Sequence, residues 1–189
     1  LRGHLKELEV DQNVKAIILT GCGKFFSFGF DIPEFLSFTK EEFTNYLINF
    51  TDLYTYLFLY PKPVVAALNG HTIAGGCMLA LACDSRVMVV GKSKISLNEI
   101  DFGSSVFAGS TEILRFCIGS AAAAKVLYSG VMYSAEEAIN LGLVQEAVKE
   151  PNLMAQAKVI ALDLASKHPP AFASIKSLLR KPIAENMMQ

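Results

Sequence analysis

Long apolar runs are missing from this sequence: none reaches the roughly 18 residues that a membrane-spanning helix requires. The mean hydropathy of +0.36 is nevertheless high, so we assign the surplus apolar residues to a core and to contacts between subunits. Charged residues are also scarce, at 19% of the chain, and the net charge is −1 with no basic stripe. This charge balance argues against a nucleic-acid partner.

The sequence also lacks closely spaced cysteine pairs and histidines at the spacing typical of metal ligands. The cysteines form no CxxC pair, which predicts free thiols in a reducing compartment; they are Cys22, Cys77, Cys83 and Cys117. The histidines lie far apart without ligand spacing, so we predict no metal site; they are His4, His71 and His168.

The first residues, Leu1 to His4, lack an initiator methionine and any signal-peptide pattern. We therefore expect a cytoplasmic protein whose ends are incomplete or whose disordered ends are absent. Because the termini are in doubt, a mitochondrial or peroxisomal location stays open.

The chain does contain enough apolar material for one domain, since 52% of its 189 residues are hydrophobic. Apolar, β-branched runs alternate with helical patterns, and this alternation predicts an α/β fold. Strands are expected at 14–20, 64–68, 85–90, 94–97 and 143–148. Helices are expected at 39–60, 77–83, 111–116, 120–128, 134–142, 151–168 and 171–180. Two of these helices should begin with capping boxes, Thr39 with Glu42 and Ser134 with Glu137.

The stretch 63–84 predicts a strand, a turn and the start of a buried helix. An apolar run ends at Asn69-Gly70, a typical turn pair, and Ala74-Gly75-Gly76 precedes the apolar segment 77–83. A helix N-terminus presents unpaired N–H groups and partial positive charge, and small residues let a substrate approach the backbone. This stretch therefore suits a developing negative charge on oxygen, or it is a tight packing joint between strand and helix.

A second loop, 27–31, has the same design, because it also follows an apolar strand and carries glycine where the chain turns toward a helix. Two such loops from neighbouring parallel strands would lie side by side at the strands' carboxyl ends, where open α/β sheets bind ligands. One N–H group from each loop could then hold the same oxygen, as in an oxyanion hole.

The glycines of 21–26 follow a strand, as in a dinucleotide fingerprint. Phe26 occupies the place of the third glycine, where a bulky side chain blocks close packing of helix on strand. We therefore predict no nicotinamide cofactor and no other cofactor.

Four segments together resemble the enoyl-CoA hydratase/isomerase (crotonase) superfamily. Residues 25–32 resemble its F-(C/S)-A-G-A-D-(I/L) segment, and 62–77 resemble its KPV-(I/V)-A-x-(I/V)-NG-xxxGGG-x block, with Asp84 at its C-D. Residues 94–103 resemble its F-x-x-P-E-x-x-x-G, and 133–144 its A-x-E-A-x-x-x-GLV. The match covers almost the whole chain, in the family's order.

The resemblance implies a ClpP/crotonase-like ββα spiral with C-terminal helices, and a homotrimer that is often paired into hexamers. It implies a core at 1–150 without the family's first strands, and an incomplete C-terminal helical region of the same domain at 151–189. It also implies an acyl-CoA thioester substrate, which brings coenzyme A as part of the substrate. The trimer contact is expected along the apolar helices after Gly119 (Ala121 to Ala124, Val126, Leu127, Tyr128, Val131, Met132 and Tyr133) and from Pro151 onward.

The same resemblance places the oxyanion hole at the N–H groups of Phe30 and Gly75. Hydratases of the family manage water with two glutamates, of which this chain keeps Glu99 and replaces the other with Met78. One carboxylate suits a 1,3-proton shift, and Leu97-Asn98-Glu99 resembles the pattern of the family's Δ3,Δ2-enoyl-CoA isomerases.

Three functions stay open: an enoyl-CoA isomerase with Glu99 as its catalytic base, a hydratase or other CoA-thioester enzyme, and a non-catalytic acyl-CoA or protein-binding module. Glu99 could also be a solvated loop residue. If Met78, Phe102 and Phe107 form an apolar pocket around it, its pKa should rise toward neutrality. Further substrate contacts are expected at Phe28, Gly29, Asp31, Ile32, Ala74, Gly76, Met78, Phe102 and Phe107. The loop 103–109 departs from the family pattern, so the sequence does not predict which acyl group the substrate carries.

Overall fold

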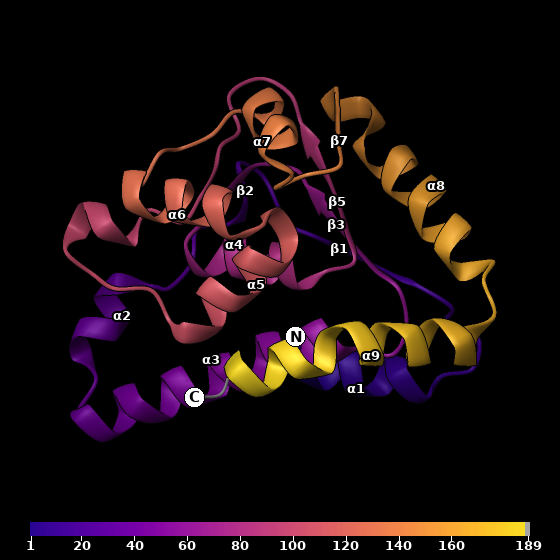
Figure 1. Cartoon of the computed structure of the whole chain (residues 1–189), viewed down its shortest axis with the longest axis horizontal. Helices are drawn as coiled ribbons and strands as arrows, with labels where there is room; N and C mark the ends of the chain where they lie inside the picture. Colours follow the sequence, from indigo (N-terminus) through magenta and orange to yellow (C-terminus); the bar gives the residue numbers. More distant parts are fainter. Residues whose placement is uncertain (188–189) are drawn as a thin grey trace.

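The computed structural model describes residues 1–187 and contains two parallel sheets. The larger sheet has the order β1 (Ile17–Thr20), β3 (Val64–Leu68), β5 (Ser85–Val89) and β7 (Glu146–Val148), and every neighbouring pair is parallel (Figure 1). The predicted strand 14–20 forms only from Ile17. It lies at the edge of this sheet, so it is half-buried, whereas β3 is fully buried.

The smaller sheet was not predicted in full. It consists of β2 (Phe25–Ser27), β4 (His71–Ile73) and β6 (Ile95–Ser96), again all parallel. Strands of two or three residues are too short to show a hydrophobic period, so only the third was predicted. The Asn69 side chain joins the two sheets, because it accepts a hydrogen bond from the Gly21 N–H at 2.9 Å and donates to the Phe25 carbonyl at 3.2 Å.

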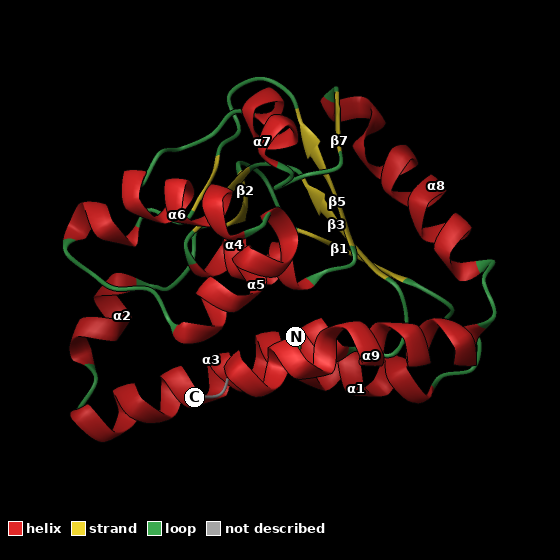
Figure 2. Cartoon of the chain, in the orientation of Figure 1, coloured by secondary structure: helices red, strands yellow, loops and turns green. Residues whose placement is uncertain are grey.

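Helices surround the strands on both faces (Figure 2). On one face of the larger sheet, α8 (Leu153–Ala165) packs against buried side chains of β3 and β5, and α4 (Gly75–Ala82) lies on the other side with α5 (Ala108–Ile118) (Figure 1). Within residues 1–187, no helix combines the length and apolar character needed to cross a membrane. The helices are α1 (Arg2–Val10), α2 (Ile32–Ser37), α3 (Lys40–Leu59), α4 (Gly75–Ala82), α5 (Ala108–Ile118), α6 (Ser120–Ser129), α7 (Ala135–Leu141), α8 (Leu153–Ala165) and α9 (Pro169–Met187), with 3₁₀ turns η1 (Glu99–Phe102) and η2 (Glu150–Asn152).

Both predicted capping boxes are confirmed. Thr39 accepts a hydrogen bond from the Glu42 N–H while the Glu42 carboxylate accepts one from the Thr39 N–H, and Ser134 and Glu137 repeat this exchange at α7. Gly142 ends α7 with φ 81°, in the left-handed conformation that glycine adopts readily. These helix ends are therefore specified by local sequence.

The last helix is longer than predicted. We expected Pro169-Pro170 to end one helix and a second to span 171–180, but α9 begins at Pro169 and continues through Pro182 to Met187. Proline is tolerated in the first turn of a helix because the N–H that it lacks has no partner there. The chain instead breaks at 166–168, between α8 and α9.

Helix α9 runs along α3, next to α5, and is attached to the core through Asp84 (Figure 1). The Asp84 carboxylate lies 2.8 Å from Lys176 Nζ and 3.0 Å from Arg180 Nη2, and both cations are buried. Arg180 also donates to the carbonyl oxygens of Phe58 and Ala82, at 2.9 and 3.0 Å. Asp84 is thus a structural carboxylate that holds α9 on the core.

Candidate active site

The three segments predicted to carry the chemistry all follow strands of the smaller sheet. The loop with Phe30 follows β2, Ala74 and Gly75 follow β4, and Glu99 follows β6 by three residues. Since these strands are parallel neighbours in the order β2-β4-β6, their carboxyl ends meet at one edge. The expectation of two adjacent loops is therefore confirmed, although the strands that carry them belong to the sheet that was largely missed.

The two loops pack directly against each other. A Cβ at Gly29 would lie 3.1 Å from the Cβ of Ala74 and 3.2 Å from the Gly75 nitrogen, and Gly29 has φ +91°. A Cβ at Gly76 would lie only 2.3 Å from the Ser27 carbonyl oxygen. Side chains at these two positions would push the loops apart, so glycine is required for their close approach.

The N–H groups of Phe30 and Gly75 have no partner among the described hydrogen bonds of residues 1–187. Gly75 is the first residue of α4, so its N–H also lies at the positive end of the helix dipole. This pair can stabilise negative charge on an oxygen placed between the loops.

Glu99 carries a buried carboxylate oxygen. Its side chain is half-buried, and its Oε2 atom is shielded from solvent with no hydrogen-bond partner in the described part of the chain. Burial raises the pKa of Glu99, as the sequence predicted, while a hydrogen bond to its own backbone opposes the rise. A carboxylate with a raised pKa and an unused oxygen suits proton transfer near neutral pH.

Glu99 and Gly75 follow segments that are hydrogen-bonded to each other. The Ala74 N–H, one residue before Gly75, donates to the carbonyl oxygen of Ser96 at 2.9 Å, and Ser96 precedes Glu99 by three residues. The candidate base and one candidate oxyanion donor therefore lie on neighbouring segments at the same edge of the smaller sheet.

Met78 stands where the sequence resemblance places the family's second glutamate. It is only 1% exposed, and its sulfur accepts a hydrogen bond from the Ser110 hydroxyl at 3.0 Å. Ser110 is itself buried in α5. This position therefore offers an apolar wall and no ionisable group.

Aromatic rings cover the site on the side of α3. The ring centroid of Phe30 lies 4.7 Å from that of Phe50, 5.4 Å from that of Tyr46 and 6.1 Å from that of Phe107. A Cβ on Gly75 would lie 3.3 Å from the Phe50 ring. Phe50 lies in the predicted helix 39–60, but helical spacing cannot show which loop a helix contacts.

Three other predicted substrate contacts are exposed. Phe28, Ile32 and Phe102 are 58%, 56% and 66% exposed, so most of each side chain contacts solvent. Phe102 is therefore a poor wall for Glu99, in contrast to the predicted pocket. Asp31, another predicted substrate contact, caps α2 by accepting a hydrogen bond from the Glu34 N–H at 3.3 Å.

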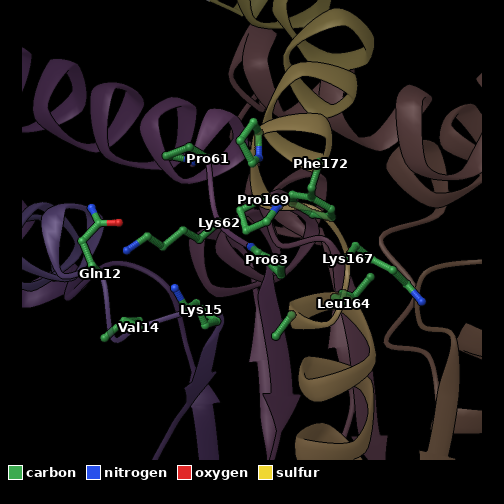
Figure 3. A pocket seen from close by; sticks show the side chains of 12 residues that line it. Gln12, Val14, Lys15, Pro61, Lys62, Pro63, Leu164, Lys167, Pro169 and Phe172 are labelled. Atoms are coloured by element: carbon green, nitrogen blue, oxygen red, sulfur yellow. The ribbon is translucent and has the colours of Figure 1, made fainter.

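Two cavities lie away from these loops. One, of about 290 Å³, is lined by the starts of β3 and α9 and by three lysines (Figure 3). Lys62 and Lys167 extend in opposite directions (Figure 3). The Lys62 ammonium donates to the Leu8 and Asp11 carbonyl oxygens. The second, of about 770 Å³, lies between α8 and α9. Neither is lined by Glu99, Phe30 or Gly75, and residues 1–187 contain no cluster of His, Cys, Asp and Glu able to hold a metal.

The sequence was compared with protein families and curated proteins. A family model described as enoyl-CoA hydratase/isomerase matches residues 1–189. A probable enoyl-CoA hydratase of Bacillus subtilis is 36% identical over 178 residues, which is 93% of this chain and 68% of that protein. The mitochondrial enoyl-CoA delta isomerase 1 of Mus musculus is 31% identical over 187 residues, or 98% of this chain and 65% of that protein.

Solved structures of enoyl-CoA hydratases and isomerases are also similar to this chain. The human mitochondrial delta3-delta2-enoyl-CoA isomerase superposes with a TM-score of 0.95 at 28% identity, over 98% of this chain and 72% of that one. A probable enoyl-CoA hydratase from Mycobacterium tuberculosis superposes with a TM-score of 0.92 at 26% identity, over 99% of this chain and 78% of that one.

Proposed function

This chain belongs to the enoyl-CoA hydratase/isomerase family and has the crotonase fold, and from that premise we propose that it converts 3-enoyl-CoA to 2-enoyl-CoA. The family acts on acyl-CoA thioesters, in which the carbonyl makes the C2 proton weakly acidic. Removal of that proton places negative charge on the carbonyl oxygen, and the N–H groups of Phe30 and Gly75 would stabilise this charge. Each such donor is worth roughly 3–4 kcal/mol in the transition state.

In the proposed reaction Glu99 moves one proton. Its carboxylate takes the proton from C2, and the electron pair of that C–H bond forms the dienolate. The protonated Glu99 then returns the proton to C4, the C2–C3 double bond forms, and the carboxylate is regenerated. No water, metal or second acid is consumed.

One observation carries the choice of reaction: Glu99 has a buried, unpartnered oxygen, whereas the position of the second family glutamate holds buried Met78. Adding water needs one group to activate the water and another to deliver a proton, while a 1,3-shift needs a single group to accept and return the same proton. A relative named as a probable hydratase favours hydration as the second candidate. With only Glu99 available, hydration should be slow.

The proposal is tested by supplying a 3-enoyl-CoA and following the absorbance of the conjugated 2-enoyl-CoA. We expect rapid conversion, with much slower hydration of crotonyl-CoA in a parallel assay. Fast hydration without isomerisation would show that the interpretation of Met78 is wrong. Calorimetry that detects no binding of any acyl-CoA, together with a protein partner, would favour the non-catalytic module.

The pH dependence of isomerisation should report on Glu99. Because the base must be deprotonated, kcat/KM is expected to rise with pH, and its midpoint should lie above the ordinary glutamate value of 4.5 because burial raises the pKa. The pKa is higher in the folded than in the unfolded chain, so ionisation of Glu99 lowers the unfolding free energy as pH rises through the folded pKa. A midpoint at or below 4.5 in the free enzyme would contradict this environment.

We also propose that the protein is a homotrimer. In the patch predicted after Gly119, Ala123, Val126 and Tyr133 are buried within the subunit, which corrects part of that prediction, but Tyr128 is 78% exposed. Further apolar side chains are exposed along the C-terminal helices, and a patch of this kind is typical of an interface; they include Val159, Leu162, Ile175, Leu178 and Leu179.

Light scattering tests this assembly. The expected mass at micromolar concentration is three times the chain mass of 20.6 kDa, or six times if trimers pair. A stable mass near 20.6 kDa would rule the trimer out.

A further inference from the structure

Ala74 has a backbone conformation that alanine rarely adopts. Its φ is 50° and its ψ is −122°, and it is the only residue other than glycine with positive φ among those that the structure describes. A Cβ atom is disfavoured in this region, and such residues persist only where their surroundings impose the conformation. The residue lies directly before Gly75, at the N-cap of α4.

Three contacts impose this conformation. The Ala74 N–H donates to the Ser96 carbonyl oxygen at 2.9 Å, which ties it to β6, the strand that precedes Glu99. The Ala74 carbonyl oxygen accepts from the Met78 N–H at 3.1 Å, which begins the helical ladder of α4. Its methyl group lies against Gly29, where an added Cβ would be 3.1 Å away.

The ψ angle of Ala74 sets the plane of the peptide that joins Ala74 to Gly75, and with it the direction of the Gly75 N–H. We propose that Ala74 is a positioning residue: its strained conformation aims the Gly75 N–H at the substrate oxygen and holds this donor in register with Glu99. This inference rests on the proposed isomerase function.

Glycine at position 74 would accept the same φ and ψ with less strain, but it would also accept many others. Without the methyl group against Gly29, the peptide plane could rotate and the Gly75 N–H would spend less time in the productive direction. Relief of strain should therefore raise the stability of Ala74→Gly, whereas loss of orientation should lower its kcat. If Ala74 had only a structural role, its replacement would lower stability and kcat together.

The test compares wild-type protein with Ala74→Gly, Ala74→Ser and the control Ala155→Gly, at an exposed position of α8. For Ala74→Gly we expect kcat to fall about tenfold, less than the loss of a whole oxyanion donor, with KM within about twofold and a thermal midpoint no lower than that of the wild type. Ala74→Ser, which keeps a Cβ, should retain more of kcat than Ala74→Gly. Ala155→Gly should lower the thermal midpoint slightly and leave kcat unchanged, because glycine is a poorer helix former than alanine and α8 carries none of the residues assigned to the site.

A second readout does not depend on turnover. The absorption of a conjugated aminocinnamoyl-CoA moves to longer wavelength when its thioester oxygen accepts hydrogen bonds, and we expect a smaller shift when it is bound to Ala74→Gly than to the wild type. An unchanged kcat and an unchanged shift in Ala74→Gly, or a fall in kcat matched by a lower thermal midpoint, would overturn the role of Ala74. If wild-type protein fails to isomerise any 3-enoyl-CoA, the proposed function is wrong, and the shift alone decides whether Ala74 orients the donor.

Discussion

Replacing Glu99 with glutamine is expected to lower kcat for isomerisation of 3-enoyl-CoA by about 10²–10⁴-fold, the usual contribution of a positioned acid–base group. Glutamine keeps the size and polarity of the side chain but cannot take the proton from C2 or return it to C4. KM should change little, because the oxyanion donors and the aromatic wall remain. The loss is measured from the absorbance of the conjugated product at saturating substrate.

Asp101 provides a matched control, because it is an exposed carboxylate two residues further along η1. Asp101→Asn should keep nearly full activity. Equal losses in the two variants would show that two carboxylates share the proton transfer, and full activity in Glu99→Gln would refute the assignment of the base.

The stability of Glu99→Gln separates loss of chemistry from loss of fold. Burial raises the pKa of Glu99, so the ionised side chain opposes folding at neutral pH. The neutral glutamine removes that penalty, and the thermal midpoint of the variant should equal or exceed that of the wild type above the folded pKa. A lower midpoint would mean that the ionised Glu99 side chain stabilises the fold.

Replacing Asp84 with asparagine should destabilise the protein by about 3–5 kcal/mol, the usual cost of leaving a buried ion unpaired. Asp84 faces two buried cations, Lys176 and Arg180. Burial lowers the pKa of Lys176 to about 8 even though the Asp84 carboxylate raises it, so loss of that carboxylate should discharge Lys176. Arg180 would stay charged and unpaired. In a domain of this size the thermal midpoint should fall by about 6–20 °C.

The exposed pair of Asp163 and Lys167 is the control, because its N–O distance is also 2.8 Å. Its side chains are 65% and 52% exposed, so Asp163→Asn should change the unfolding free energy by no more than about 0.5 kcal/mol. Thermal or urea unfolding measures both variants. Similar small losses at Asp84 and Asp163 would show that α9 is held by its apolar contacts and not by Asp84.

Residues close together in the sequence determined several strands and helix starts of this protein. The apolar runs predicted the four strands of the larger sheet, and the Thr39 and Ser134 capping boxes predicted where two helices begin, because each depends on residues close in the chain. Loop glycines and a glutamate at family positions predicted the candidate site. The expected raised pKa of Glu99 and the contact between the two loops are both found in the structure.

Only the tertiary structure decided how distant segments meet. The strands β2 and β4 have too few residues to show a period, and they exist because parallel neighbours pair with them. Asp84 meets Lys176 across 92 residues of sequence, and the Phe50 ring reaches Gly75 from another helix. The strained φ of Ala74 arises from its contacts with Ser96 and Gly29. Local propensity acts over a few residues, whereas these features depend on packing between segments whose separation in the sequence leaves no local pattern.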